Sequence, residues 1–156
     1  KLKEGNADTD GFQVVQKWPD GHFITEKGTS REECWRDSFR FIREQWAESI
    51  RRAEECRAPF LHGGDYAVQK GCSAMKPLGR ALHAVQDMFA HHCVTEKEHG
   101  EIKADNNHRH PMEWFMAQVA TSAFAATHRA VLKSKGWSEL DIRCCLEIPC
   151  SKYNGP

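Results

Sequence analysis

Hydrophobic positions recur with helical spacing over most of the chain beyond residue 30. The first such segment, residues 30–57, opens with a Ser30–Glu33 capping box and stops before Pro59. The second has Pro77 in its first turn, and the third covers residues 111–136 and closes on a glycine. Their apolar stripes predict three amphipathic helices, lined by Trp35, Phe39, Ile42, Trp46, Ile50 and Ala53, then by Leu78, Ala81, Leu82, Val85, Met88 and Phe89, then by Trp114, Phe115, Val119, Ala120, Ala123, Phe124 and Val131.

Shorter signals lie between and after these segments. A brief helix is predicted from Asp65 to Gly71, and Ser138 with Asp141 resembles the cap of a last short helix. Residues 95–111 are polar and rich in histidine, without an apolar period, so we expect a loop there. The aromatic side chains of the long helices are assigned to the core.

The first 30 residues differ from the rest. Short apolar runs at 12–15 and 22–25 flank an Asp20-Gly21 turn, which is typical of a β-hairpin. We therefore predict a mainly α fold, a compact bundle of four to six helices with a small N-terminal β-hairpin. The single domain, 1–156, divides into an extended element at 1–29, a helical metal-binding core at 30–148 and a tail at 149–156.

Composition narrows the class of protein. Lys and Arg number 22, as do Asp and Glu, so the formal net charge is zero. That balance argues against a strongly basic nucleic-acid binder, and no run of about 20 apolar residues predicts a transmembrane segment. The chain starts at Lys1 without a signal peptide, so we expect an excerpt of a larger or processed protein. Seven cysteines are compatible with one to three disulfides or with buried thiols.

The strongest chemical signal is the spacing of His83, Asp87 and His91. Residues at i, i+4 and i+8 project from one side of a helix. Leu82 and Phe89 flank that side, so the three polar groups lie at the edge of the apolar stripe. A carboxylate buried between two imidazoles needs a partner, and a divalent metal supplies one. A surface His–Asp ion pair is the competing interpretation.

Further histidines strengthen the metal interpretation. His62 stands in a glycine-rich loop, and several more follow in the polar segment, ending at His110. Glu113 begins the next helix. Because one helix cannot complete a coordination shell, other segments must contribute ligands.

The segment Leu78-Gly79-Arg80-Ala81-Leu82-His83-Ala84-Val85-Gln86-Asp87-Met88-Phe89-Ala90-His91 resembles the core helix of the zinc-dependent phospholipase C and P1-type nuclease superfamily. The closer likeness is to HET-C-like variants and to toxin domains of large secreted bacterial proteins. The resemblance covers about 16 residues, roughly a tenth of the chain. It implies a helical fold with one to three Zn²⁺ ions and hydrolysis of a phosphodiester bond.

By this resemblance His83, Asp87 and His91 would bind zinc, and His62 would match a loop ligand. The family's downstream His-x-x-x-Glu has no equivalent of that length. His110-Pro111-Met112-Glu113 is one residue shorter, and we carry His110 and Glu113 over as metal ligands. The family's N-terminal Trp ligand is absent at Lys1, and its early-helix Asp would fall at Asp37.

The resulting hypothesis is a secreted or delivered phosphodiesterase of phospholipase C type. Asp87 and Glu113 are the candidate catalytic groups, and Arg80 would meet a substrate phosphate. The substrate would be a phospholipid or another phosphodiester, with nucleic acid only as a substrate, and a toxin would imply an immunity or carrier protein. The alternatives are a nuclease on the same scaffold, another zinc hydrolase acting on peptide or cell-wall bonds, and a metal-binding helical module without turnover.

Overall fold

The structure is a computed structural model that describes residues 21–25, 28–61, 74–102 and 109–142. The described part is mainly α-helical, as the sequence predicts. Its long helices are α3 (Arg31–Leu61), α4 (Met75–His91) and α6 (Pro111–Ser134), its short ones α5 (Glu96–Ile102) and α7 (Glu139–Ile142), and its strands β1 (Ile24–Thr25) and β2 (Val94–Thr95).

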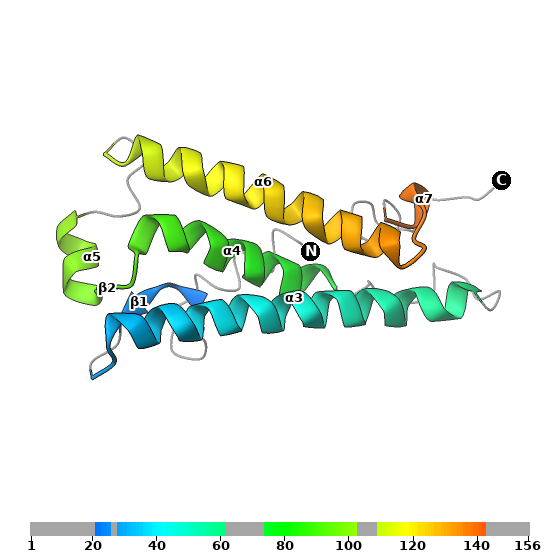
Figure 1. The fold of residues 1–156 in the computed structure, drawn as a ribbon, viewed down its shortest axis with the longest axis horizontal. Coiled ribbons are helices and arrows are strands. Elements are labelled where there is room, and N and C mark those ends of the chain that lie inside the picture. The colour runs from blue at the N-terminus through cyan, green and yellow to red at the C-terminus, as the bar shows by residue number, and fades with distance from the viewer. Residues whose placement is uncertain (1–20, 26–27, 62–73, 103–108, 143–156) are drawn as a thin grey trace.

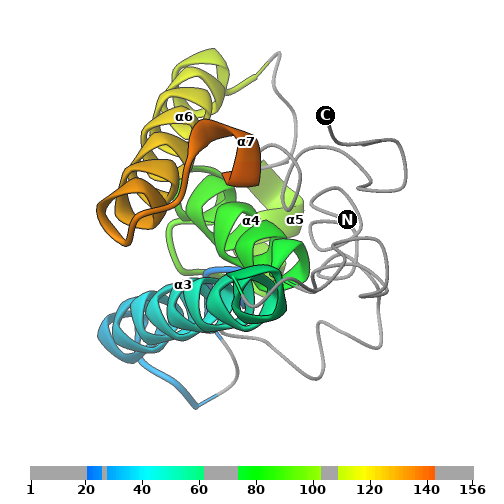
Figure 2. The ribbon, with the colours of Figure 1, turned by 90° about the vertical axis from the view of Figure 1, so that its right-hand side faces the viewer.

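Helix α4 lies between α3 and α6 and packs against both of them (Figure 1). Seen along the helices, α3 and α6 occupy two corners and α4 the centre of the described part (Figure 2). This central position explains why α4 buries almost every side chain between Met75 and Asp87. A polar group on α4 is therefore placed in the interior.

The predicted helix starts are confirmed in their capping contacts. Glu33 N–H donates to Ser30 Oγ over 3.1 Å, and Ser30 N–H donates to Glu33 Oε2 over 2.9 Å. Ser138 and Asp141 form the same reciprocal pair at α7. Each pair satisfies backbone N–H groups that the first turn of a helix leaves without partners.

Two predicted boundaries are wrong. Helix α3 continues to Leu61 and so includes Pro59, before which the sequence predicts its end. Near a helix end a proline removes only one hydrogen bond, here to the carbonyl of the exposed Glu55, which water can hydrate. The expected loop at 95–111 contains α5, whose Thr95–Glu98 capping box starts it: Glu98 N–H donates to Thr95 Oγ1 over 3.2 Å.

The described part of the small sheet differs from the expected hairpin. Strand β1 pairs in parallel with β2, with Ile24 opposite Val94 and Thr25 opposite Thr95. Residues 12–20 of the predicted hairpin lie outside the described residues, as does the helix predicted from Asp65 to Gly71. The observed pairing joins the start of the described chain to the end of α4.

A disulfide reinforces that junction. Cys34 on α3 is bonded to Cys93, which lies just beyond α4, 59 positions away in the sequence. Both sulfurs belong to an apolar cluster with Phe23, Phe41 and Val85. The bond excludes Cys93 as a thiolate ligand and confirms that at least one cysteine pair is oxidised.

A second polar feature holds the other end of the bundle. Ser49 Oγ donates to the carbonyl of Ala74 over 2.8 Å and lies 3.0 Å from Nε2 of the buried His128. Because the only hydroxyl proton goes to Ala74, the imidazole must donate Nε2–H to Ser49. Burial lowers the pKa of His128 to about 4, so this side chain is neutral at neutral pH.

Assigning the helix aromatics to the core is wrong in part. Trp35, Trp46 and Phe124 are partly buried, but Phe39, Trp114 and Phe115 are exposed. Helix α6 packs mainly on α4, with fewer contacts to α3 and α7, and this packing leaves the face that carries Phe115 exposed. Among the described helices, none is both long and apolar enough to cross a membrane.

Candidate metal centre

Helix α4 carries His83, Asp87 and His91 on one face, and all three side chains are buried. Leu78, Leu82 and Val85 anchor the helix in the core, and this packing forces the polar face inward as well. The prediction that these groups lie inside the molecule, at the edge of the apolar stripe, is confirmed.

The fourth member of the cluster is His22, which the turn before β1 brings to α4. Its Nδ1 lies 3.1 Å from Asp87 Oδ2 and 3.3 Å from His83 Nε2. His83 Nε2 lies 3.0 Å from the same Asp87 oxygen. Two imidazole nitrogens and one carboxylate oxygen therefore form a small triangle among buried side chains.

Hydrogen bonds can satisfy at most two of the three contacts in this triangle. The carboxylate only accepts, so each nitrogen must carry a proton to bond to it. If both nitrogens are protonated, their N–H groups oppose each other over the 3.3 Å contact. If one is not, its lone pair faces the carboxylate oxygen. A cation at the centre would be attracted by all three atoms at once.

The dimensions of the triangle fit a transition metal. Zn–N and Zn–O bonds of about 2.0–2.1 Å at tetrahedral angles place neighbouring ligand atoms roughly 3.3 Å apart. The three observed edges are 3.0, 3.1 and 3.3 Å. Nitrogen and carboxylate donors are also the set that zinc binds, so the described residues fit this group.

Asp87 is charged in this environment. Burial by itself would raise the pKa of the carboxyl, but hydrogen bonds from His22 and His83 and electrostatic interactions with His83 and His91 outweigh it. The net effect holds the pKa of Asp87 below its ordinary value. A buried, ionised carboxylate provides the negative charge that a divalent cation needs.

His91 is oriented by the backbone. Its Nδ1 lies 2.6 Å from the carbonyl oxygen of His22, and because a carbonyl only accepts, this nitrogen carries the proton. In the neutral ring Nε2 then keeps its lone pair. That atom lies 3.1 Å from Nε2 of His99 on α5, with the two rings edge to face. A backbone carbonyl that fixes the tautomer is a common partner of metal-binding histidines.

The backbone on both sides of these contacts is unusual. Among the described residues, the non-glycine positions with positive φ are Phe23 (50°), His92 (51°) and Cys93 (54°). Phe23 directly follows His22, and His92 and Cys93 are the two residues after His91. Left-handed backbone is costly for such residues and persists only where the surroundings impose it, which often occurs at functional sites.

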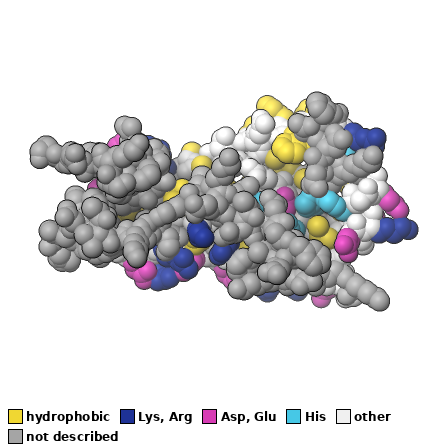
Figure 3. Space-filling model, turned by 180° about the vertical axis from the view of Figure 1, so that it is seen from behind, with side chains coloured by type: hydrophobic (Ala, Val, Ile, Leu, Met, Phe, Trp, Pro, Cys, Tyr) yellow, Lys and Arg dark blue, Asp and Glu magenta, His cyan; other side chains and the backbone are white. Residues whose placement is uncertain are grey.

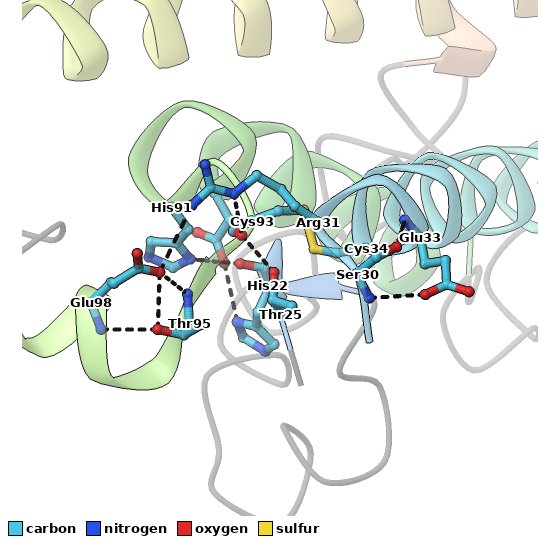
Figure 4. Close-up of a disulfide and its surroundings, with 11 residues drawn as sticks. His22, Thr25, Ser30, Arg31, Glu33, Cys34, His91, Cys93, Thr95 and Glu98 are labelled. Atoms are coloured by element: carbon cyan, nitrogen blue, oxygen red, sulfur yellow. Dashed lines mark hydrogen bonds and ion pairs between the residues drawn. A yellow bond between two sulfur atoms is a disulfide. The ribbon is translucent and has the colours of Figure 1, made fainter. Parts of the chain in front are cut away.

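The disulfide and its neighbours impose it here (Figure 4). Cys93 is tied to Cys34, and its carbonyl accepts hydrogen bonds from Thr25 Oγ1 over 2.5 Å and from Arg31 Nε over 3.3 Å. These contacts join α3, β1 and the end of α4 at one point. They fix His22 and His91 relative to each other.

Several predicted site residues lie elsewhere. His62 is outside the described residues. His110 and Glu113 do lie together, with His110 Nδ1 3.9 Å from Glu113 Oε1, but His110 Nε2 meets the carbonyl of Ile102 over 3.0 Å. The buried triangle includes neither of them.

Arg80 and Asp37, two further predicted site residues, lie outside the buried triangle. Arg80 is half-buried on α4, one turn before His83. Asp37 forms surface ion pairs with Arg36 and Arg40, at 3.2 and 3.1 Å. Among the described residues, it is not part of the metal-capable group.

Sequence reasoning missed His22 as a ligand and left His99 unassigned. His22 is 61 positions from His83, so no periodicity connects them. For His99 a signal was present, because the Thr95-x-x-Glu98 box predicts a helix that would carry it.

Histidine side chains reach the surface on the rear face, near hydrophobic side chains of the helices (Figure 3).

Comparisons with family models, with curated proteins and with solved structures found no match to this chain.

Proposed function

We propose that the chain is a zinc-dependent phosphodiester hydrolase of phospholipase C type. The observation that carries the proposal is the buried triangle of His22 Nδ1, His83 Nε2 and Asp87 Oδ2, with edges of 3.0 to 3.3 Å. The His83–Asp87–His91 helix that resembles the phospholipase C and P1-type nuclease superfamily supplies two of these atoms.

The residues divide into ligands and supports. His22, His83 and Asp87 would hold one zinc ion, and His91 with His99 would hold a second through their facing Nε2 atoms, 3.1 Å apart. Bound zinc would neutralise phosphodiester oxygens and lower the pKa of a water to about 7. His22 has a second task, because its carbonyl keeps the proton of His91 on Nδ1 and leaves Nε2 free of one.

Asp87 would balance the positive charge, since its pKa is held below the ordinary value. Glu113 lies at the start of α6 with His110 beside it. It would either exchange a proton with the substrate or bind the second zinc ion as a further ligand. Arg80 would contact a phosphate oxygen. The roles of Glu113 and Arg80 rest on the resemblance and on their positions in the sequence.

Charge and redox state favour a delivered enzyme that acts on lipid. A zero net charge does not provide the dense Lys and Arg surface that long nucleic acids reward, so a lipid or small phosphodiester is preferred over a duplex. The Cys34–Cys93 disulfide fits an oxidising compartment. We therefore propose a secreted or delivered toxin domain, for which a producing cell would need an immunity protein.

Hydrolysis assays on the zinc-loaded chain test the activity. Phosphatidylcholine vesicles, single-stranded DNA, RNA and a casein control are offered to the wild type, to Asp87→Asn and to His92→Asn. His92 is the matched control because it is exposed and next to His91, and asparagine tolerates its left-handed backbone.

We expect release of phosphocholine by the wild type and His92→Asn but not by Asp87→Asn. Cleavage of DNA or RNA alone would show a nuclease in place of the proposed phospholipase C. Cleavage of casein alone would indicate a peptide hydrolase. Zinc binding without turnover on any substrate would leave a metal-binding helical module.

A further inference from the structure

Helix α6 presents an apolar face that no described element covers. Met112, Phe115, Met116 and Val119 expose 66, 57, 44 and 48 % of their surface. They lie within the first three turns, on the side opposite the buried Ala117, His128 and Leu132. In Figure 2 this helix stands at the edge of the described bundle, with α4 on one side only.

The exposed face continues along the helix with a regular spacing. Apolar residues recur there at alternating steps of four and three. All six of these side chains are exposed: Met112, Met116, Val119, Ala123, Ala126 and Ala130. This alternation is the heptad seam of a coiled coil, in which successive a and d positions face a partner helix. It spans 19 residues, and its 18 steps of 1.5 Å give a length of about 27 Å.

The seam is large at one end and small at the other. Its N-terminal half holds Met112, Met116 and Val119, and its C-terminal half holds three alanines. A second copy of α6, running antiparallel about a two-fold axis at the level of Thr121, would place large side chains opposite small ones. The three layers would be Met112 with Ala130, Met116 with Ala126 and Val119 with Ala123.

We propose that two copies of this chain associate through antiparallel pairing of their α6 helices. Every layer joins an a position to a d position, which is the arrangement antiparallel coiled coils require, and every layer matches large with small. A parallel pair would instead stack Met on Met at one end and leave a void between alanines at the other.

Charge also permits this pairing. Residues 114–127 contain no Asp, Glu, Lys or Arg, so two identical faces can meet without like-charge repulsion. A two-fold contact of one patch with itself is the commonest form of homodimer. Six seam positions, three of them alanine, offer less than the about 800 Å² per partner of a standard interface, so we expect a dimer that dissociates on dilution.

Sedimentation velocity on the full chain over a wide concentration range tests the proposal. We expect the wild type to shift from monomer to dimer as concentration rises, and Met116→Glu and Ala126→Glu to remain monomeric. Gln118→Glu is the matched control, because it adds the same charge at an exposed position of α6 outside the seam, and it should dimerise like the wild type.

The register has its own test in a double variant, Met116→Glu with Ala126→Lys. In the antiparallel pair the glutamate introduced in each copy would face the lysine introduced in the other copy, so dimerisation should return. In a parallel pair like charges would face each other, so a monomeric double variant would overturn the antiparallel register. Circular dichroism confirms that each variant is folded.

A wild type that stays monomeric at every concentration overturns the proposal, as does a dimer unaffected by Met116→Glu. Co-sedimentation of such a monomer with phosphatidylcholine vesicles would assign the seam to a lipid surface instead.

Discussion

His91 donates a hydrogen bond from Nδ1 to the backbone carbonyl of His22 across 2.6 Å. The contact joins the end of α4 to the turn before β1, and it determines which nitrogen of His91 keeps a lone pair. The same turn places the His22 side chain against Asp87. One short segment therefore contributes a ligand with its side chain and orients another with its backbone.

The first prediction concerns the stoichiometry of zinc. If His91 and His99 hold a second ion through Nε2 atoms 3.1 Å apart, the wild type binds at least two zinc ions per chain and His99→Ala binds one fewer. Mass spectrometry under non-denaturing conditions counts them. Equal counts in the two proteins would remove His99 from the ligand set and leave its contact with His91 as a hydrogen bond.

The second prediction concerns the disulfide. Closing a loop of 59 positions between Cys34 and Cys93 is worth about 4 kcal/mol in the chain-entropy description of cross-links. Cys34→Ala with Cys93→Ala should lower the free energy of unfolding by about this amount, as measured by urea denaturation. Wild type treated with a reductant is the matched comparison.

The same double variant should also bind zinc more weakly, because Cys93 fixes the backbone next to His91. A variant that loses stability but keeps the zinc affinity of the wild type would show that the site does not depend on the disulfide.

The third prediction follows from the buried His128. Its pKa in the folded chain is lowered to about 4, against an ordinary value of 6.5, so the unfolded state binds a proton first as pH falls. The stability that the neutral imidazole contributes is complete above about pH 6.5, declines below it and is lost by about pH 4. The two pKa values correspond to a loss of about 3 kcal/mol.

Urea denaturation of metal-free protein between pH 4 and 8 measures this effect as the difference between wild type and His128→Gln. Both proteins share every other titrating group, so their difference isolates His128. We expect the wild type to lose more stability on acidification. Parallel pH profiles would mean that His128 does not carry this dependence.

The sequence predicts the helical part of the structure well because its signals are local. The Ser30–Glu33 and Ser138–Asp141 boxes form as expected, and Gly136 adopts the positive φ of a helix end, 83°. The spacing of His83, Asp87 and His91 predicts their shared, buried face for the same reason. In each case the relevant residues lie within a few turns of one helix.

The parts that the sequence does not predict depend on contacts between distant segments. The pairing of Ile24 with Val94 and the approach of His22 to Asp87 are set by tertiary packing, which spacing along the chain does not encode. The apolar character of Trp114 predicts its burial, yet burial depends on whether a neighbour covers that point of the helix: Leu132, five turns further along the same side of α6, is buried and Trp114 is not.

The metal centre itself is tested most directly by calorimetric titration of zinc into the wild type, His22→Ala and His92→Asn. We expect the wild type and His92→Asn to bind alike. Loss of an outer partner of a metal ligand weakens metal binding by about 10- to 100-fold. Because His22 is itself a proposed ligand, His22→Ala should weaken zinc binding by more than this. A folded wild type that takes up no zinc, or a His22→Ala variant that binds it as tightly as the wild type, would contradict the assignment of His22, His83 and Asp87 as a metal site.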